Sequence, residues 1–345
     1  MHINAHSHLL PEPGQIPRFM VEQQIFSVDE DRRFMRQGNW SRPVTDPSFF
    51  LSEKLVWMEQ NHIDHCVVLN LSQLYCNGME QGTTRDVLRF QNDFNASLQH
   101  DYPTKFTGGF VIQPRYVDDA LIEIERCVTT LNMQVLCLPT HFLNHQNVWT
   151  SVADPSCYPI FELANRHHLA IEIHPYDGPE IVALQDQFWR FHLVWMCALT
   201  ADTFHFFTLY DFPSRFPDTR TCFAHGNQFG QVNMGRRIQG FEGRPDLFPG
   251  AVSPRKHISD TNVFYDTLVH DVLSFELLIK RQGVEQVIAG MDDPYPLGEM
   301  DTVAGCYPGK ILDQALSQNI ITRTDHNAIW YDNVINWLGK SIPTS

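Results

Sequence analysis

Eight short apolar segments, separated by segments with helical spacing, constrain the fold of this chain more than any other feature. They are the segments 2–6, 66–71, 106–112, 133–139, 169–175, 219–225, 262–268 and 286–292. Near-continuous apolar runs of this length are typical of strands covered on both faces, as in a parallel sheet. Helical patterns occur between them at 52–62, 117–131, 159–168 and 270–283. This alternation predicts an α/β fold, a (β/α)8 TIM barrel, with an open doubly wound sheet as the alternative.

Two stretches interrupt the alternation and carry proline, glycine and mixed charge. Residues 12–48 follow the first apolar segment, and residues 294–322 follow the eighth. Loops this long in a compact domain are usually lids or inserted subdomains. We therefore expect one barrel domain over 1–345, with a small insertion at 12–48 and a long loop at 294–322. Both stretches follow the C-terminal ends of strands, where barrel active sites lie.

The charge balance excludes several classes of partner. Lys and Arg number 25 against 40 Asp and Glu, a formal net charge of −15, and such a surface repels phosphate backbones. There is no signal-peptide pattern and no membrane-spanning apolar stretch. We expect a cytoplasmic protein that binds neither nucleic acid nor membrane.

The eight cysteines form no CxxC pair, so we expect buried, reduced thiols.

Imidazole and carboxylate side chains stand where several predicted strands end. His6 and His8 lie two residues apart, which places both on one face of a strand. The fifth, sixth and eighth segments end near His174, His225 and Asp292. The C-terminal ends of barrel strands meet at one rim, so we expect these side chains to converge there. Four other histidines beside predicted helix ends are expected at the surface: His62, His65, His167 and His168.

Histidine and aspartate together suit a borderline divalent metal ion, with Zn²⁺ favoured and Mn²⁺ an acceptable alternative. Three histidines and one aspartate leave a coordination position for water or substrate. The fourth strand region, "MQVLCLPTH", contains no Lys or Glu that would bridge a second ion. We therefore expect one metal ion per chain.

At these residues the chain resembles the amidohydrolase superfamily, in its decarboxylase branch. The resemblance rests on the motifs "HSHLLP", "IHPYDG", "FPDTRTCFAHG", "MGRRIQGFEGRPDL", "FYDTLVHD" and "IAGMDDPYPLGE", which follow one another along nearly the whole chain. It implies a barrel of the metal-dependent hydrolase type with a small insertion after the first strand. It also implies zinc held, together with water, by His6, His8, His174 and Asp292.

The resemblance assigns roles to further residues. His225 matches a catalytic histidine that acts on the water without binding the metal. Trp189 matches an aromatic residue of the pocket wall. Arg236 matches an arginine that reaches across a dimer interface to a substrate carboxylate, so a homodimer is expected. A second substrate arginine belongs to the insertion, and for it Arg36 is our candidate, with Arg33 and Arg42 as alternatives.

The chain departs from the family pattern around the pocket rather than at the metal ligands. Polar or altered side chains stand at Tyr176, Arg190, His192, Asn227, Gln228 and Asp293. We interpret these as a rewritten pocket wall, with Asn227 in contact with substrate. The identity of the substrate is therefore more open than the chemistry.

The resulting hypothesis is a metal-dependent, non-oxidative decarboxylase of a small conjugated or aromatic carboxylate, of the aminocarboxymuconate semialdehyde type. Metal-activated water would act with His225 as general base, and Asp292 would shuttle a proton while remaining a ligand. The alternative is a hydrolase or hydratase of a small unsaturated or cyclic carboxylate at the same site, favoured by Asn227, Gln228 and Asp293. The arginines indicate a small anionic substrate.

Overall fold

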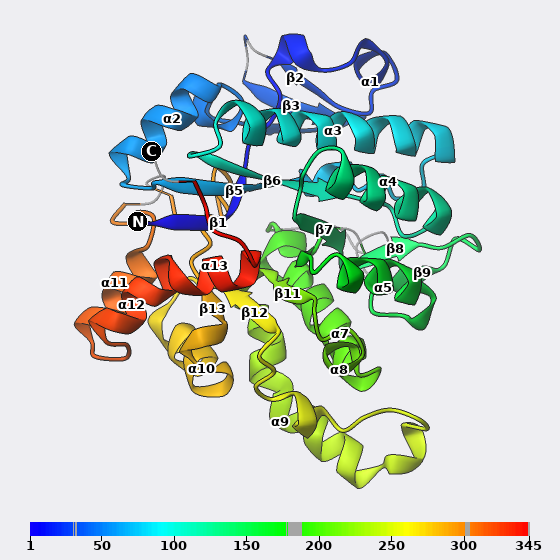
Figure 1. The fold of residues 1–345 in the computed structure, drawn as a ribbon, viewed down its shortest axis with the longest axis vertical. Helices are drawn as coiled ribbons and strands as arrows, with labels where there is room; N and C mark the ends of the chain where they lie inside the picture. The colour runs from blue at the N-terminus through cyan, green and yellow to red at the C-terminus, as the bar shows by residue number, and fades with distance from the viewer. Residues whose placement is uncertain (30, 32, 177, 179–187, 301–303, 344–345) are drawn as a thin grey trace.

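The core of the molecule is an eight-stranded parallel sheet whose strands follow one another in chain order (Figure 1). The computed structural model describes residues 1–29, 31, 33–176, 178, 188–300 and 304–343. The strands are β1 (Ile3–His8), β5 (His65–Leu69), β6 (Phe106–Val111), β7 (Val135–Pro139), β10 (Ala170–His174), β11 (Arg220–Phe223), β12 (Val263–Asp266) and β13 (Val287–Ile288). The eight strands expected from the sequence are all present.

The sheet closes on itself where its first strand meets the segment of its last. The amide of Ala5 donates to the carbonyl of Ala289 at 2.7 Å, and the amide of Asp292 donates to the carbonyl of His6 at 2.8 Å. A doubly wound sheet would instead reverse its strand order at a switch point and keep two free edges. The predicted (β/α)8 barrel is therefore confirmed over the open-sheet alternative.

Alternation along the strands separates two apolar clusters. In β10, Ile171 and Ile173 pack with helix residues such as Phe161 in the larger cluster. Ala170 belongs to the second cluster, with Val135 of the neighbouring strand. Because alternate residues of a strand face opposite sides, Glu172 and His174 share the side of Ala170. This alternation directs polar side chains toward the axis of the barrel.

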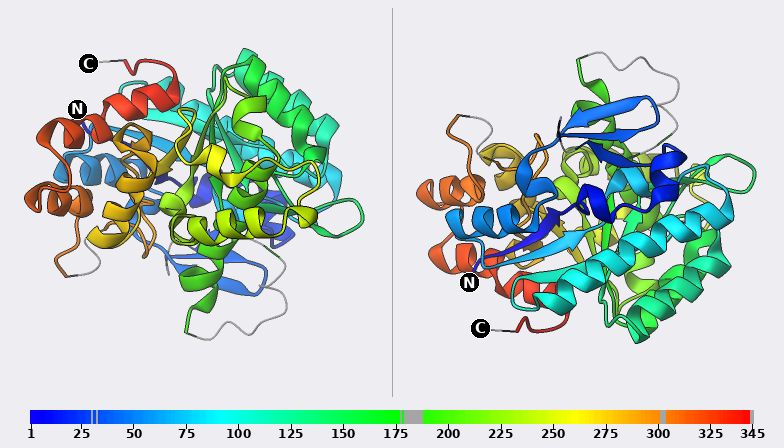
Figure 2. Two further views of the ribbon diagram at one scale, coloured as in Figure 1. Left: turned by 90° about the horizontal axis from the view of Figure 1, so that it is seen from below. Right: turned by 90° about the horizontal axis from the view of Figure 1, so that it is seen from above.

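Helices surround the strands on the outside (Figure 2). They are α1 (Arg18–Glu22), α2 (Leu51–Gln60), α3 (Gln81–Asp101), α4 (Val117–Thr129), α5 (Tyr158–Arg166), α7 (Met196–Leu209), α8 (Phe212–Arg215), α9 (Gln228–Gly243), α10 (Val272–Gln282), α11 (Lys310–Ser317), α12 (Arg323–Trp330) and α13 (Asp332–Leu338). The four helices expected from the sequence correspond to α2, α4, α5 and α10. Helix α10 ends at Gly283, whose φ of 86° suits a residue without a side chain.

The two irregular stretches contain ordered elements. Within 12–48, strands β2 (Ser27–Asp29), β3 (Phe34–Gln37) and β4 (Trp40–Pro43) form a small antiparallel sheet, although residues 30 and 32 lie outside the described residues. A two-stranded ribbon of β8 (His141–Leu143) and β9 (Trp149–Ser151) follows β7. Of the long loop expected at about 294–322, the described residues before 310 are irregular, and α11, which the sequence analysis did not predict, occupies Lys310–Ser317, although residues 301–303 lie outside the described residues. The Glu299 carboxylate accepts the amides of Gly309 and Ile311 at the start of this helix.

The expectation that His65 lies at the surface is wrong. It is fully buried in β5, where its ring contacts the Thr104 carbonyl at 3.1 Å and the Thr107 hydroxyl at 2.9 Å. A histidine with partners on both nitrogens satisfies its polar groups inside a core. All eight cysteines are free thiols and most are buried, with Cys197 and Cys306 partly exposed.

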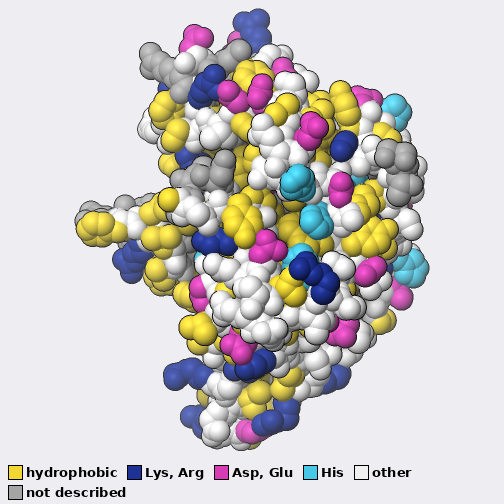
Figure 3. All heavy atoms as spheres, turned by 90° about the vertical axis from the view of Figure 1, so that its left-hand side faces the viewer, with side chains coloured by type: hydrophobic (Ala, Val, Ile, Leu, Met, Phe, Trp, Pro, Cys, Tyr) yellow, Lys and Arg dark blue, Asp and Glu magenta, His cyan; other side chains and the backbone are white. Residues whose placement is uncertain are grey.

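The molecular surface carries charges of both signs. On the face shown in Figure 3, acidic and basic side chains are interspersed over most of the surface, with histidines near its centre. Among the described residues, no helix combines the length and the apolar character needed to cross a membrane.

Candidate metal centre and substrate cavity

A β-bulge in the first strand directs its two histidines into the barrel. The pairing register of β1 with β5 shifts between Asn4 and Ser7, and such a shift re-aims the residues that follow it. Ile3 and Ala5 belong to the second apolar cluster, and after the shift His6 and His8 take over the inward positions. Asn4 and Ser7 face the opposite side.

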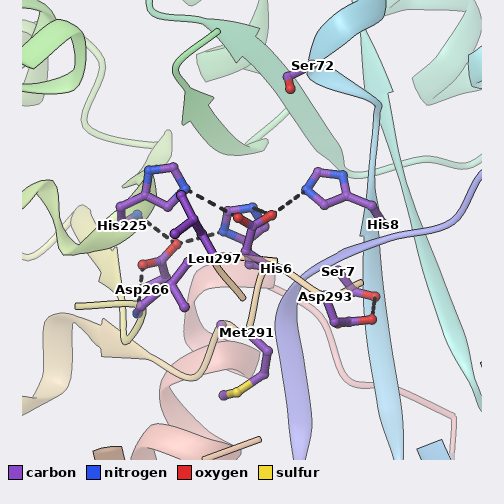
Figure 4. A network of polar contacts seen from close by, with 12 residues as sticks. His6, Ser7, His8, Ser72, His225, Asp266, Met291, Asp293 and Leu297 are labelled. Atoms are coloured by element: carbon purple, nitrogen blue, oxygen red, sulfur yellow. Dashed lines mark hydrogen bonds and ion pairs between the residues drawn. The ribbon is translucent and has the colours of Figure 1, made fainter. Parts of the chain in front are cut away.

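Four strand ends bring their polar side chains together at one rim of the barrel (Figure 4). The His6 ring lies 5.2 Å from that of His8 and 5.1 Å from that of His174, and the rings of His174 and His225 lie 5.0 Å apart. Oδ1 of Asp292 lies 3.2 Å from Nε2 of His8 and 3.4 Å from Nε2 of His6. The structure therefore places all five sequence-predicted residues around one point.

Several buried polar atoms of this cluster have no hydrogen-bond partner in the protein. They are Nε2 of His6, both ring nitrogens of His8 and of His174, and Oδ1 of Asp292. Buried polar atoms are nearly always satisfied, so a group of unsatisfied ones calls for a specific explanation. A three-histidine, one-aspartate donor set fits a zinc or manganese ion.

A four-residue set of close donor atoms differs by one residue from the expected ligand set. One atom each from His6, His174, His225 and Asp292 lies within 4.8 Å of the others. His8 stands beside this set, with its ring 5.0 Å from the ring of Tyr295. Both His8 and His225 are thus close enough to the cluster for either to complete it, and their separate roles remain predictions.

Asp266 at the end of β12 contacts two residues of the cluster, His6 and His225. The sequence analysis did not identify it. Its Oδ2 lies 2.8 Å from Nδ1 of His6 and accepts the His225 amide at 3.0 Å, while Oδ1 accepts the Gly226 amide at 2.9 Å. A carboxylate on Nδ1 fixes the tautomer of a metal-binding histidine and leaves Nε2 for the ion. The available signal was an acid in the seventh predicted strand, in "FYDT".

The electrostatics of the cluster are dominated by burial and by its two aspartates. Burial alone would lower the pKa of His6, but Asp292 and Asp266 outweigh it and raise that pKa to about 9. Burial, with the neighbouring His225, holds the pKa of His174 well below its usual range. Burial opposes ionisation of Asp292, yet His6 and His225 hold its pKa well below the usual value. In the metal-free protein these shifts favour a protonated His6 beside an ionised Asp292, and a cation that binds His6 displaces that proton, because a histidine ligand must be neutral.

Glu172 of β10 is a second residue that the sequence analysis missed. It is fully buried, belongs with His6 and Asp266 to a group of close donor atoms, and its Oε1 has no protein partner. Burial raises its pKa to about 8. It lies two residues before His174 on the same face of the strand. The alternation in "IEIH" was the signal that could have indicated an acidic side chain pointing into the barrel.

A cavity opens beside the cluster. Residues of the cluster line it together with Arg42, Ser72, Gln73, Tyr176, Trp189, His192, Met196, Cys197, Leu268, His270, Tyr295, Pro296 and Leu297. Arg42 belongs to the small sheet of the insertion, so that sheet covers the site. Aromatic and apolar walls with a few polar groups are typical of small-molecule sites.

Of the three candidate arginines in the insertion, Arg42 lies in the cavity lining and the preferred candidate Arg36 does not. The guanidinium of Arg42 stacks over the Tyr295 ring at 4.3 Å, and its buried Nε and Nη2 atoms have no protein partner. Arg36 instead pairs with Asp29 at 3.4 Å, and Arg33 pairs with Asp46. The strand register explains the difference, because Arg42 pairs with Met35 and Arg36 pairs with Ser41, which places the two arginines on opposite faces of the small sheet.

Asn227, expected to contact substrate, does not line the cavity. It has a φ of 47° at the start of α9, and its side chain occupies the space that a Cβ at Gly230 would need. Gln228 also lies outside the lining and donates to the Val269 carbonyl at 2.6 Å. The Asp293 side chain points toward α2, where it pairs with Lys54. Of the altered positions, Tyr176 and His192 do line the cavity, as does the predicted Trp189.

Arg236 does not reach the cavity of its own chain. It is exposed on α9, and the same helix exposes the apolar side chains of Phe229 and Val232. Contact between Arg236 and a substrate therefore requires a second chain.

Comparisons with known proteins agree with this geometry. A family model described as "Amidohydrolase" matches residues 80–333, about three quarters of the chain. The chain belongs to the amidohydrolase family. A 2-amino-3-carboxymuconate-6-semialdehyde decarboxylase of Caenorhabditis elegans is 34% identical, over 87% of this chain and 86% of the relative. One of Dictyostelium discoideum is 24% identical, over 98% and 91%.

Solved structures share the fold of this amidohydrolase at low sequence identity. The 5-carboxyvanillate decarboxylase of Sphingomonas paucimobilis has a TM-score of 0.75 and 18% identity over 99% of both chains. A dihydroxybenzoic acid decarboxylase of Polaromonas, solved with bound manganese and 2-nitroresorcinol, has a TM-score of 0.74 and 14% identity over 98% of this chain and 96% of that one.

Proposed function

We propose that this amidohydrolase is a metal-dependent, non-oxidative decarboxylase of a small conjugated or aromatic carboxylate. The observation that carries the proposal is the juxtaposition of two unsatisfied groups in one cavity. The buried donor atoms of His6, His8, His174 and Asp292 call for a cation, and two buried guanidinium nitrogens of Arg42 call for an anion. Both curated relatives are decarboxylases of a conjugated carboxylate. We further infer a cytoplasmic homodimer with one zinc ion per chain, for which manganese is the alternative.

The side chains of the cavity divide the work of binding. Arg42 offers two donors to a carboxylate, a pairing that is shorter and stronger than a neutral hydrogen bond. The Tyr295 hydroxyl is buried and has no protein partner, so it can meet a further oxygen of the substrate. Trp189 and Tyr176 supply aromatic wall for a flat substrate. Arg236 of a second chain would supply another donor at the open side.

A metal ion held by the cluster supplies Lewis acidity to an oxygen of water or substrate. His225 holds the proton that the reaction moves, since its Nε2 faces Oδ2 of Asp292 at 3.7 Å and its ring lines the cavity. Asp266 fixes the His225 backbone and the His6 ring. When the bond to the carboxylate carbon breaks, the electron pair enters the conjugated system, CO₂ leaves, and a proton takes its place on carbon.

The hydrolase or hydratase alternative loses its specific support. It rested on Asn227, Gln228 and Asp293, and none of them lines the cavity. Mass analysis separates the reactions, because decarboxylation removes CO₂ and hydration adds water.

The test is a panel of muconate semialdehydes and hydroxybenzoates, followed by ultraviolet absorbance, CO₂ release and product mass. We expect CO₂ release with at least one substrate. Activity should disappear with a chelator and return with Zn²⁺ or Mn²⁺ at one ion per chain. Products that gain water without losing CO₂ would contradict the proposal, and two ions per chain would contradict the single-metal centre.

A further inference from the structure

A buried ion pair lies directly behind the proposed metal centre. Lys54 of α2 pairs with the carboxylate of Asp293, and both side chains are essentially inaccessible to solvent. Lys54 also donates to the Ser7 hydroxyl at 2.9 Å, and Ser7 donates to Asp293 at 3.3 Å. Figure 4 shows Ser7 and Asp293 facing each other, apart from the imidazoles. None of these three groups lines the cavity.

The same network joins the two chain segments that carry His6, His8 and Asp292. Asn4 donates to Asp293, and Oδ1 of Asn4 accepts the amides of His6 at 3.1 Å and Met291 at 3.0 Å. The His8 amide donates to the Asp293 carbonyl at 2.8 Å. Hydrogen bonds of Asn4, Ser7, Met291 and Asp293 therefore tie the segment of His6 and His8 to the segment of Asp292.

Asp292 needs such support because its backbone is in the left-handed region, with a φ of 51°. A residue with a side chain persists in that region when its surroundings over-determine it. The surroundings here are the Asp293 side chain, clamped by Lys54, Ser7 and Asn4. The Asp293 side chain points toward Lys54 of α2, whereas the adjacent Asp292 lines the cavity, so a displacement of Asp293 also displaces Asp292.

We propose that the Lys54–Asp293 pair is a positioning device that sets the separation between Asp292 and the histidines of β1. The inference rests on the proposed metal centre. Partners outside the ligand shell typically change metal affinity 10–100-fold when they are removed. Loss of the pair should therefore weaken metal binding and lower kcat, with little change in KM, since no member of the pair faces the substrate.

The test uses the full-length protein and measures the dissociation constants of Mn²⁺ and Co²⁺, together with the visible spectrum of the Co²⁺ form. Lys54→Met is expected to weaken binding about 10–100-fold and to alter the Co²⁺ spectrum. Removing one partner leaves a buried charge uncompensated, so this variant can fail to fold. The double variant Lys54→Met/Asp293→Leu removes both charges and is expected to recover the melting temperature of the metal-free protein but not the metal affinity.

Glu123→Gln is the matched control. Glu123 is a buried carboxylate paired with Arg126 at 2.7 Å on the outer helix α4, and its loss should leave metal affinity and spectrum unchanged. Wild-type affinity and spectrum in the folded double variant would overturn the inference, as would an equal loss in Glu123→Gln. A wild-type protein that binds no metal would overturn the proposed function and this inference together.

Discussion

Nε2 of His225 lies 3.7 Å from Oδ2 of Asp292, and both residues have left-handed backbones, with φ of 57° and 51°. His225 comes after β11, which ends at Phe223, and Asp292 comes after β13, which ends at Ile288. The unusual backbone turns both side chains toward the same point. A proton donor or acceptor is thereby held against a metal-ligand candidate.

His225→Asn tests whether His225 is a base or a ligand. Asparagine tolerates the left-handed backbone, so the fold should persist. We expect metal content to be unchanged and kcat to fall about 10²–10⁴-fold, the usual contribution of general acid–base catalysis. The measurements are metal analysis and a rate assay on the purified variant. Full activity would refute the assignment, and loss of the metal would make His225 a ligand, in which case His8→Asn should retain it.

Arg42→Gln should raise KM with little change in metal content. The substitution removes a charged donor whose buried nitrogens face the cavity, and a hydrogen bond to a charged group contributes about 1.5–3 kcal/mol, or roughly 10–100-fold in KM. Arg36→Gln is the control, because Arg36 is partly exposed and paired with Asp29, and should change KM less than about twofold. Equal effects of the two substitutions would rule out Arg42 as the substrate arginine.

Arg236 should act only in the partner's site. A mixture of His225→Asn and Arg236→Gln proteins, each inactive alone, should regain activity after subunit exchange. In a two-fold dimer with sites shared between chains, a mixed dimer contains one intact site, so random exchange restores about a quarter of wild-type activity. Size-exclusion chromatography provides the oligomeric state. A monomeric protein with full activity, or an active Arg236→Gln variant, would contradict this arrangement.

We expect the stability of the protein to depend on pH through the protonation of Glu299. Burial raises its pKa from 4.5 to about 7 in the folded chain, against the two amides that it accepts. Between these values the folded state keeps a proton that the unfolded state has released, so the free energy of unfolding falls as pH rises from 4.5 to 7. The metal-free Glu299→Gln variant cannot ionise there and should lose less stability between pH 5 and pH 8. Thermal unfolding at both pH values checks this, and parallel curves for the two proteins would contradict it.

Much of the fold could be predicted because strand and helix patterns are local. A run such as "VLCLP" needs only its own residues to indicate a covered strand, and chain order then determines neighbours in a barrel. The convergence of His6, His8, His174, His225 and Asp292 follows from the same rule. The burial of the His65 side chain could not be predicted from local patterns, because a polar residue inside a strand is buried only where distant segments supply its hydrogen-bond partners.

The sequence by itself determined the barrel, the rim on which the reactive side chains lie, and the residue types available to a metal. Tertiary structure alone decided which polar residues face the cavity. Arg42 rather than Arg36 reaches it through strand register, and a one-residue bulge turns Asn4 outward, although plain alternation would place it on the face of His6 and His8. Asp293 follows a metal-ligand candidate yet faces Lys54, which is 239 residues away in the chain. Side-chain direction depends on contacts between segments remote in sequence, and no local pattern encodes them.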